Sequence, residues 1–385
     1  MNNNIDLLQK KSKLKFIASL LLIILILFFI ISEVYQLINR SQIENLFSSS
    51  EPFGVLVISN KQTDKIKETG FIGVAIIYPK TSRIGIVSLL PQVKLQASLP
   101  PLQELIRKEK YSNIVSSLSK MLNIDIPAYI SIPLKSIEKA VDMIEGLPWF
   151  NYQPFSLLNE KLPAGEQLLD GSKIKSLLYP KQNKSIVQVV QSYRFFSLFL
   201  NYWSKREIFS KRIEDKKTFN IITNEIKANF DFSGLANIIS NLSSDKNWLP
   251  IFMELPIKKI KDIMLPHPDA ANLYLKSFKK KLESKNNPFG KSLPKIEIKN
   301  GTTIAGLAKK FRRKLNKKGL QVLEFSNADH KNYEKSILID CNSNVFYLNR
   351  VAKILKIKKK YHLVNRALFT DLILILGKDY KTLMD

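Results

Sequence analysis

The longest apolar stretch of the chain lies near its N-terminus. It runs without a charged residue from Phe16 to Ile31 and as a helix spans roughly 24 Å, at about 1.5 Å per residue. Apolar neighbours lengthen it, which predicts a transmembrane helix over residues 14–38. The alternative, a buried core helix, is disfavoured because the stretch has no polar face.

The charges around this stretch predict its orientation. Lysines at positions 10, 11, 13 and 15 precede it, whereas Glu33 follows it. This bias keeps residues 1–13 in the cytoplasm and exports the rest of the chain. No small-residue cleavage site follows closely, so we expect an uncleaved signal anchor and a single-pass protein of the cytoplasmic (inner) membrane.

Short apolar runs rich in β-branched residues predict the strands of a first α/β domain. The predicted strands are residues 53–59, 71–79, 83–90 and 126–133. The apolar spacing of residues 134–148 predicts a helix, and two further apolar helices are expected over residues 185–203 and 232–242. A strand followed by a helix is typical of an α/β layer, and we assign residues 52–257 to this domain.

A lysine-rich segment separates this region from a second alternation of strands and helices. Residues 275–295 combine lysines with Asn286-Asn287-Pro288, which favours a solvated tether, and we assign residues 258–293 to a basic helix and linker. Residues 294–385 then predict a small α/β domain. Its expected elements are strand 295–299, helix 303–317, strand 320–325, strand 336–340, a helix around 345–355 and strand 371–377.

The turn before the helix at 303–317 has the composition of a tight connection. Asn300-Gly301 tolerates positive φ, and Thr302 or Thr303 is a candidate helix cap. The predicted apolar stripe is Ile304, Leu307, Ala308, Phe311 and Leu315, with Gly319 just past the helix end. Neither the spacing of a Walker loop nor a three-glycine dinucleotide fingerprint is present, which argues against nucleotide binding.

The composition predicts an anionic partner. The chain of 385 residues has a formal net charge of +27, which predicts attraction to nucleic acid, anionic lipid headgroups or a phosphate-bearing glycan. Export weakens the nucleic-acid interpretation. The outer face of the 303–317 helix carries Lys309, Lys310, Arg312, Arg313 and Lys317 without an acid. This C-terminal basic face is either simply solvated or contacts envelope polymer or the membrane surface.

The cysteine and the histidines indicate neither a disulfide nor a metal site. Cys341 is the only cysteine, so no intramolecular disulfide forms. The three histidines, His267, His330 and His362, lack the spacing of metal ligands. We expect structural roles for all four residues.

Several segments resemble the LytR-CpsA-Psr (LCP) family. "LPAGEQLLDGSKIKSLLY" (162–179) is similar to that family's L-x-A-G-x-x-x-L-D-G motif, and "YPKTSRIGIVSLLP" (78–91) is similar to its N-P-K-T segment. The resemblance covers roughly residues 52 to 257. Residues 294–380, with "IEIKNGTTIAGLAKKFRRKLNKKGLQV", resemble the LytR C-terminal domain family.

The resemblance implies an α/β transferase that moves glycan polymer from a polyprenyl-pyrophosphate carrier onto the cell wall. Such a site uses acidic residues for a divalent metal and arginines for the pyrophosphate. This chain departs from it. Lys61 and Gly70 stand at the acidic positions, and Pro91 and Gln92 replace an arginine and an acid.

The remaining site positions are also changed. Leu177 stands at a tyrosine position and Phe195 at a glutamine position. Arg194, helped by Lys181 and Lys184, is what remains as a candidate anion contact. We therefore predict no catalytic, metal-binding or cofactor-binding residues. The opposing interpretation is a register error in which Asp64 or Glu68 supplies the carboxylates.

These observations predict a membrane-anchored envelope protein that binds or scaffolds cell-wall glycopolymer or peptidoglycan without catalysis, with a polyprenyl phosphate lipid as a further candidate partner. One alternative is an active glycopolymer–peptidoglycan phosphotransferase with a divergent, Mg²⁺-dependent site. A weaker alternative is a transcriptional attenuator that binds nucleic acid, against which the topology speaks.

The topology generates a first prediction. A reporter that works only in the exported compartment should be active when it is fused after Asp385, because the basic flank precedes the apolar run. Activity of a reporter that works only in the cytoplasm would overturn this orientation and restore nucleic acid as a partner.

Overall fold

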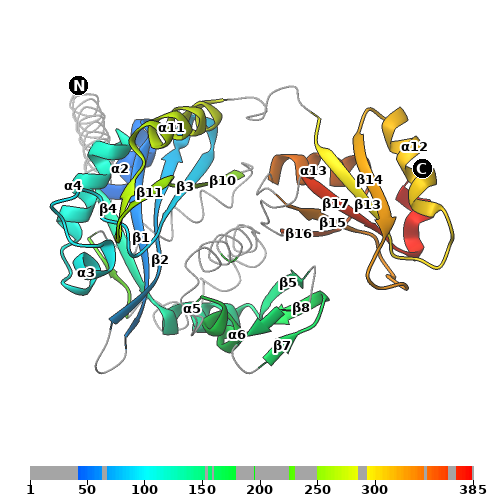
Figure 1. Cartoon of the computed structure of the whole chain (residues 1–385), viewed down its shortest axis with the longest axis horizontal. Helices are drawn as coiled ribbons and strands as arrows, with labels where there is room; N and C mark the ends of the chain where they lie inside the picture. The colour runs from blue at the N-terminus through cyan, green and yellow to red at the C-terminus, as the bar shows by residue number, and fades with distance from the viewer. Residues whose placement is uncertain are drawn as a thin grey trace, which may run out of the picture.

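The computed structural model describes residues 42–62, 67–151, 155–157, 160–178, 195, 225–229, 249–284, 293–341, 345–362 and 370–383. These residues form two units along the chain, each built on its own sheet (Figure 1). The predicted mixed α/β fold is therefore confirmed.

The first unit is built on a six-stranded mixed sheet. In spatial order its strands are β10 (Leu249–Glu254), β3 (Arg83–Leu89), β2 (Lys67–Tyr78), β1 (Phe53–Gln62), β4 (Ala128–Pro133) and β9 (Lys227–Ala228). β1, β2 and β3 form an antiparallel meander. β4 runs parallel to β1, and β10 runs parallel to β3. The four strands predicted before residue 134 are thus all present.

Helices cover both faces of this sheet. One face packs against α3 (Leu102–Arg107), α4 (Tyr111–Leu122) and α11 (Pro268–Glu283), and the other against α5 (Leu134–Met143) and α6 (Gly171–Leu178). Successive residues of a strand point to opposite faces. Leu56 and Ile58 therefore join the first core, whereas Val57 and Phe71 join the second.

Helix α11 corrects the predicted tether. Residues 275–283 belong to this helix, and Leu275, Phe278 and Leu282 are buried in the first core. Gly85 on β3 permits the close approach, because a Cβ there would lie 2.5 Å from Leu282 Cδ1. The lysine-rich composition thus describes the outer face of a packed helix.

Smaller elements complete the first unit. They are α2 (Gln42–Ser49), the 3-10 helix η1 (Pro79–Thr81), and the hairpins β5 (Leu147–Asn151) with β8 (Gly165–Leu169), β6 (Phe155–Leu157) with β7 (Glu160–Leu162), and β11 (Ile257–Ile260) with β12 (Ile263–Pro266). The helix predicted over 134–148 ends at Met143, because Glu145 and Gly146 adopt positive φ and turn the chain into β5.

The second unit has a five-stranded sheet with two helices on one face. Its strand order is β14 (Gln321–Asn327), β13 (Lys295–Asn300), β17 (Leu372–Leu376), β15 (Ile337–Asp340) and β16 (Lys359–His362). Neighbours are parallel except β15 and β17. The crossovers are α12 (Leu307–Lys317) and α13 (Val345–Ile354), and the 3-10 helix η2 (Lys378–Leu383) follows β17.

The first helix of this unit begins later than its sequence predicts. The helix expected over residues 303–317 starts at Leu307, with Gly306 as its N-cap at φ 70°. Neither threonine of the turn caps it, and Ile304 is 42% exposed rather than buried. The other residues of the predicted apolar stripe are buried as expected, and Gly319 follows the helix end at positive φ.

Three predicted helices fall outside the described residues. They are the apolar run Phe16–Ile31 and the segments 185–203 and 232–242, apart from Phe195. Among the residues that are described, no helix has both the length and the apolar character needed to cross a membrane.

Candidate functional site

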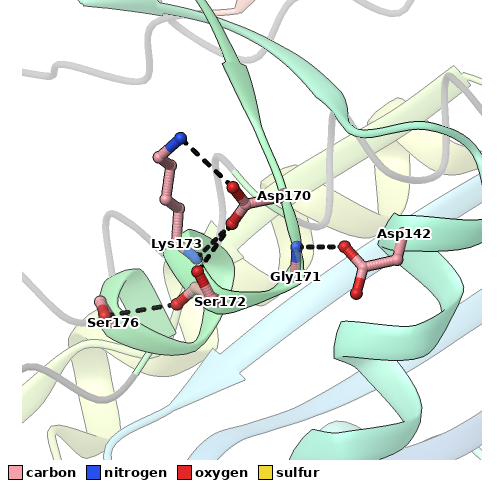
Figure 2. Close-up of polar contacts among 6 residues, drawn as sticks. All are labelled: Asp142, Asp170, Gly171, Ser172, Lys173 and Ser176. Atoms are coloured by element: carbon pink, nitrogen blue, oxygen red, sulfur yellow. Dashed lines mark hydrogen bonds and ion pairs between the residues drawn. The ribbon is translucent and has the colours of Figure 1, made fainter.

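The Leu-Asp-Gly motif forms the start of helix α6. Asp170 Oδ1 accepts hydrogen bonds from the Ser172 hydroxyl at 2.8 Å and the Lys173 N–H at 2.9 Å (Figure 2). Lys173 Nζ lies 3.2 Å from Asp170 Oδ2. Asp170 therefore satisfies donors of the first helical turn that have no partner within the helix.

Gly171 fixes this helix against its neighbour α5. Its N–H donates to Asp142 Oδ1 at 2.7 Å, as Figure 2 shows. A Cβ on Gly171 would lie 2.6 Å from the Glu138 carbonyl oxygen, so no larger residue fits without moving the backbone. The motif that carries the resemblance thus holds two helices together.

The positions that the resemblance assigns to a metal ligand and to the neighbouring arginine–acid pair lie at one end of the first sheet. Gly70 is the extra residue of a β-bulge, because its neighbour Phe71 pairs with Ser59 while Thr69 pairs with Asn60. Pro91 is buried just beyond the end of β3, beside this bulge in the strand register.

Among the described residues at these positions, none carries a carboxylate. Gln92 places a buried Oε1 there that has no hydrogen-bond partner. Over the residues the structure describes, no group of His, Cys, Asp and Glu is arranged to hold a metal ion. The side chains of Lys61, Asp64 and Glu68 lie outside the described residues, so the register alternative stays open.

Two further positions that the resemblance assigns to the site are occupied by core residues. Leu177 and Phe195 are buried together in the cluster that packs α5 and α6 against the sheet. Arg194, Lys181 and Lys184, the candidate anion contacts, lie outside the described residues, so their role stays a prediction.

The turn after β13 is closed by its own side chains. Asn300 Oδ1 accepts from the Thr302 N–H at 3.1 Å and the Thr302 hydroxyl at 2.8 Å, while Asn300 Nδ2 donates to the Ile304 carbonyl. A Cβ on Gly301 would lie 2.6 Å from Tyr333 Cδ2. Because these donors are already used, the turn has a structural role, in agreement with the sequence.

The predicted basic face of α12 is present and accessible. Lys309, Lys310, Arg313 and Lys317 are exposed, whereas Arg312 is half-buried. The Arg312 guanidinium carbon lies 5.4 Å from the centroid of the Phe325 ring, a cation–π contact. Within the described part of the chain, none of these five cations lies within ion-pair distance of a carboxylate.

A contact between the two units was missed from the sequence. Glu166 on β8 accepts from the Tyr361 hydroxyl at 2.5 Å and from Lys359 Nζ at 2.7 Å. The Phe150 and Tyr361 rings lie 5.5 Å apart. Burial, and then the bond to Glu166, raise the pKa of Tyr361. Short, lysine-rich β16 gave no strand signal, so only the structure reveals this contact.

Comparison with known proteins identifies the second unit. Residues 294–380 match the family described as LytR cell envelope-related transcriptional attenuator. This match confirms the predicted LytR C-terminal domain, and it covers less than a quarter of the chain. No curated protein matches the chain.

Several solved structures are similar to this chain at low sequence identity. An Enterococcus faecalis transcriptional regulator is 17% identical over 61% of this chain and 89% of its own, with a TM-score of 0.49. TagV from B. subtilis is 14% identical to this chain. The match covers 61% of this chain and 98% of TagV, with a TM-score of 0.49. TagT bound to LI-WTA is 10% identical to this chain. The match covers 61% of this chain and 92% of TagT, with a TM-score of 0.48.

The geometry of the motif generates a second prediction. Asp170→Ala removes the helix cap and should lower the free energy of unfolding by about 1 kcal/mol. Asp170→Asn keeps an acceptor oxygen and should cost less. Denaturation with urea, followed by the fluorescence of buried Trp149, measures both variants. An Asp170→Ala variant as stable as the parent would show that the cap contributes nothing.

The same carboxylate makes the cap sensitive to acid. Partial burial raises the pKa of Asp170, but the hydrogen bonds from Lys173 and Ser172 outweigh this effect and lower the pKa overall. The stabilisation is therefore present above the unfolded pKa of about 3.9 and is lost as the pH falls through the lower folded value. The stability difference between the parent and Asp170→Asn should shrink accordingly below about pH 4.

Proposed function

Because residues 294–380 are a LytR C-terminal domain, we propose that this chain is an exported, membrane-anchored envelope protein that binds anionic wall glycopolymer and does not transfer it. The α12 basic face is the observation that carries this proposal. Its cations project from a helix whose opposite side is fixed in the core by Leu307, Phe311 and Leu315.

The spacing of the cations suits a polymer better than a single ion. Lys309, Arg313 and Lys317 are four residues apart, so their Cβ atoms follow one another at roughly 5–6 Å along one side of the helix. Arg312 adds a guanidinium held in place by Phe325. A linear polyanion touches several of these charges at once, and each added contact raises the effective affinity.

The first unit supports binding without chemistry. A transferase must neutralise a diphosphate with a metal and guanidinium groups as the bond breaks. Here Lys61, Gly70 and Pro91 stand at positions that need an acid or an arginine, and the side chains of Leu177 and Phe195 fill core space. A lysine at a metal position adds positive charge where the ion would sit.

Polymer binding is the third prediction. The full-length chain should sediment with purified anionic wall polymer, and less should sediment as salt rises, because exposed charges are screened over roughly 8–10 Å. Changing Arg312, Arg313 and Lys317 to Glu should weaken binding at least about tenfold, since each cation near an anionic surface contributes on the order of 1 kcal/mol.

A matched control separates the α12 face from net charge. Lys258, Lys259 and Lys261 are exposed residues of the β11–β12 hairpin, and changing them to Glu alters the net charge by the same amount. This variant should sediment like the parent. If both triple variants lose binding equally, the attraction is a property of net charge and the α12 face has no special role.

Absence of turnover is the fourth prediction. The chain should release no polymer from a polyprenyl-pyrophosphate donor, with or without Mg²⁺ or Mn²⁺. Arg194→Ala serves as the comparison, because Arg194 is the arginine that the resemblance retains. Metal-dependent turnover that this substitution abolishes would replace the binding proposal with the transferase alternative.

A further inference from the structure

A second cationic feature of the C-terminal unit lies at the end of helix α13, away from α12. It is a pocket of about 800 Å³ between the last turns of α13 and strand β16. Its lining residues are Phe346, Asn349, Arg350, Ala352, Lys353, Lys356, Ile357, Lys358 and Lys360. We call it the α13 pocket. Five of these residues are cations, and none is an acid.

Four of the five cations of the α13 pocket have no ion-pair partner among the residues that the structure describes. These four, Arg350, Lys353, Lys356 and Lys358, are exposed. Arg350 and Lys353 are three residues apart on α13, so they lie on one side of the helix, and Lys356 lies just beyond the helix end. An anion in the pocket relieves the repulsion between these like charges.

The walls of the pocket are held in place. Lys360 Nζ donates to Asn349 Oδ1 at 2.8 Å, which ties β16 to α13. Lys358, just before β16, and Lys360 line the pocket, while Lys359 and Tyr361 bind Glu166 of the other unit. The Lys360–Asn349 hydrogen bond thus links the two walls of the pocket.

Size and charge indicate the ligand. Small-molecule sites typically enclose about 300–1,000 Å³, far more than a single phosphate fills. Five cations exceed the charge of one phosphate group, which carries about −2 at most. The buried side chains of Ala352 and Ile357, beside half-buried Phe346, add an apolar wall suited to the carbon skeleton of a polyol or sugar.

We propose that the α13 pocket is a second polymer site, which binds a segment of phosphodiester-linked glycopolymer through two or more of its phosphates. The choice of ligand class rests on the proposed function. The site itself does not, because it shares no residue with the α12 face. Two separate sites on one rigid unit let a single polymer chain bind twice, which raises avidity.

The test measures binding of a fluorescent oligo(glycerol phosphate) to the full-length protein by anisotropy. Neutralising the α13 pocket with Arg350→Gln, Lys353→Gln and Lys358→Gln should weaken binding at least about tenfold. Lys309→Gln with Lys310→Gln tests the α12 face in parallel. The exposed hairpin pair Lys258→Gln with Lys259→Gln should leave binding unchanged.

The pattern of losses separates the two proposals. Loss in the pocket variant supports the α13 site, whether or not the α12 variant binds normally. Full binding by the pocket variant overturns the α13 site, whatever the α12 variant does. Binding of phosphatidylglycerol vesicles that depends on the pocket, without such dependence for the oligomer, also overturns it by assigning the pocket to lipid.

Lys356 offers a variant that distinguishes a binding role from a folding role. Its φ is 55°, in the left-handed region that glycine adopts without strain, and Gly319 follows α12 in the same way. Lys356→Gly should raise the midpoint of thermal unfolding by about 2–4 °C and yet weaken oligomer binding. A more stable protein that binds as tightly as the parent would contradict the proposal.

Discussion

Both central sheets carry apolar side chains on both of their faces, and the remaining structure depends on covering them. Every residue of β3 and of β17 is buried, so neither strand has a solvated side. Burial of that area is the dominant favourable contribution to folding. In the first unit it brings α11, from a segment that looks like a linker, onto the sheet beside Gly85.

The same requirement joins the two units. Helices α12 and α13 cover one face of the C-terminal sheet, while its other face presents Ile339, Cys341 and Ile373 to Phe150 of hairpin β5–β8. Glu166 of that hairpin then pairs with β16. Burial raises the pKa of the Cys341 thiol, which keeps the only cysteine protonated and unreactive in this interface.

The residues that carry the resemblance have structural roles in this fold, whereas some positions that the resemblance assigns to the site hold apolar residues of the core. Asp170 and Gly171 cap α6 and seat it on α5, so losing either weakens the packing. Phe195, at a position where the resemblance places a glutamine, now contributes apolar volume to the same core.

Positive charge is gathered on the outer surface of the C-terminal unit. The apolar side of α12 is buried in the core, whereas Arg313 and Lys317 lie on its exposed side. In the α13 pocket, Arg350, Lys353 and Lys358 likewise form no ion pair with a described residue. Like charges held at short range repel one another, and a bound anion would relieve this repulsion.

The sequence by itself determined the four strands before residue 134, strands β13, β14, β15 and β17, the α/β class, the turn at Asn300–Gly301 and the basic face of α12, because each depends on local periodicity or backbone preference. Only the tertiary structure decided the rest. Helix α11 is recognised as core by what it touches, β16 forms because β15 offers it a partner, and the Glu166–Tyr361 contact joins residues 195 positions apart. The α13 pocket belongs with these, since a helix end and a strand become one site only when packing brings them together.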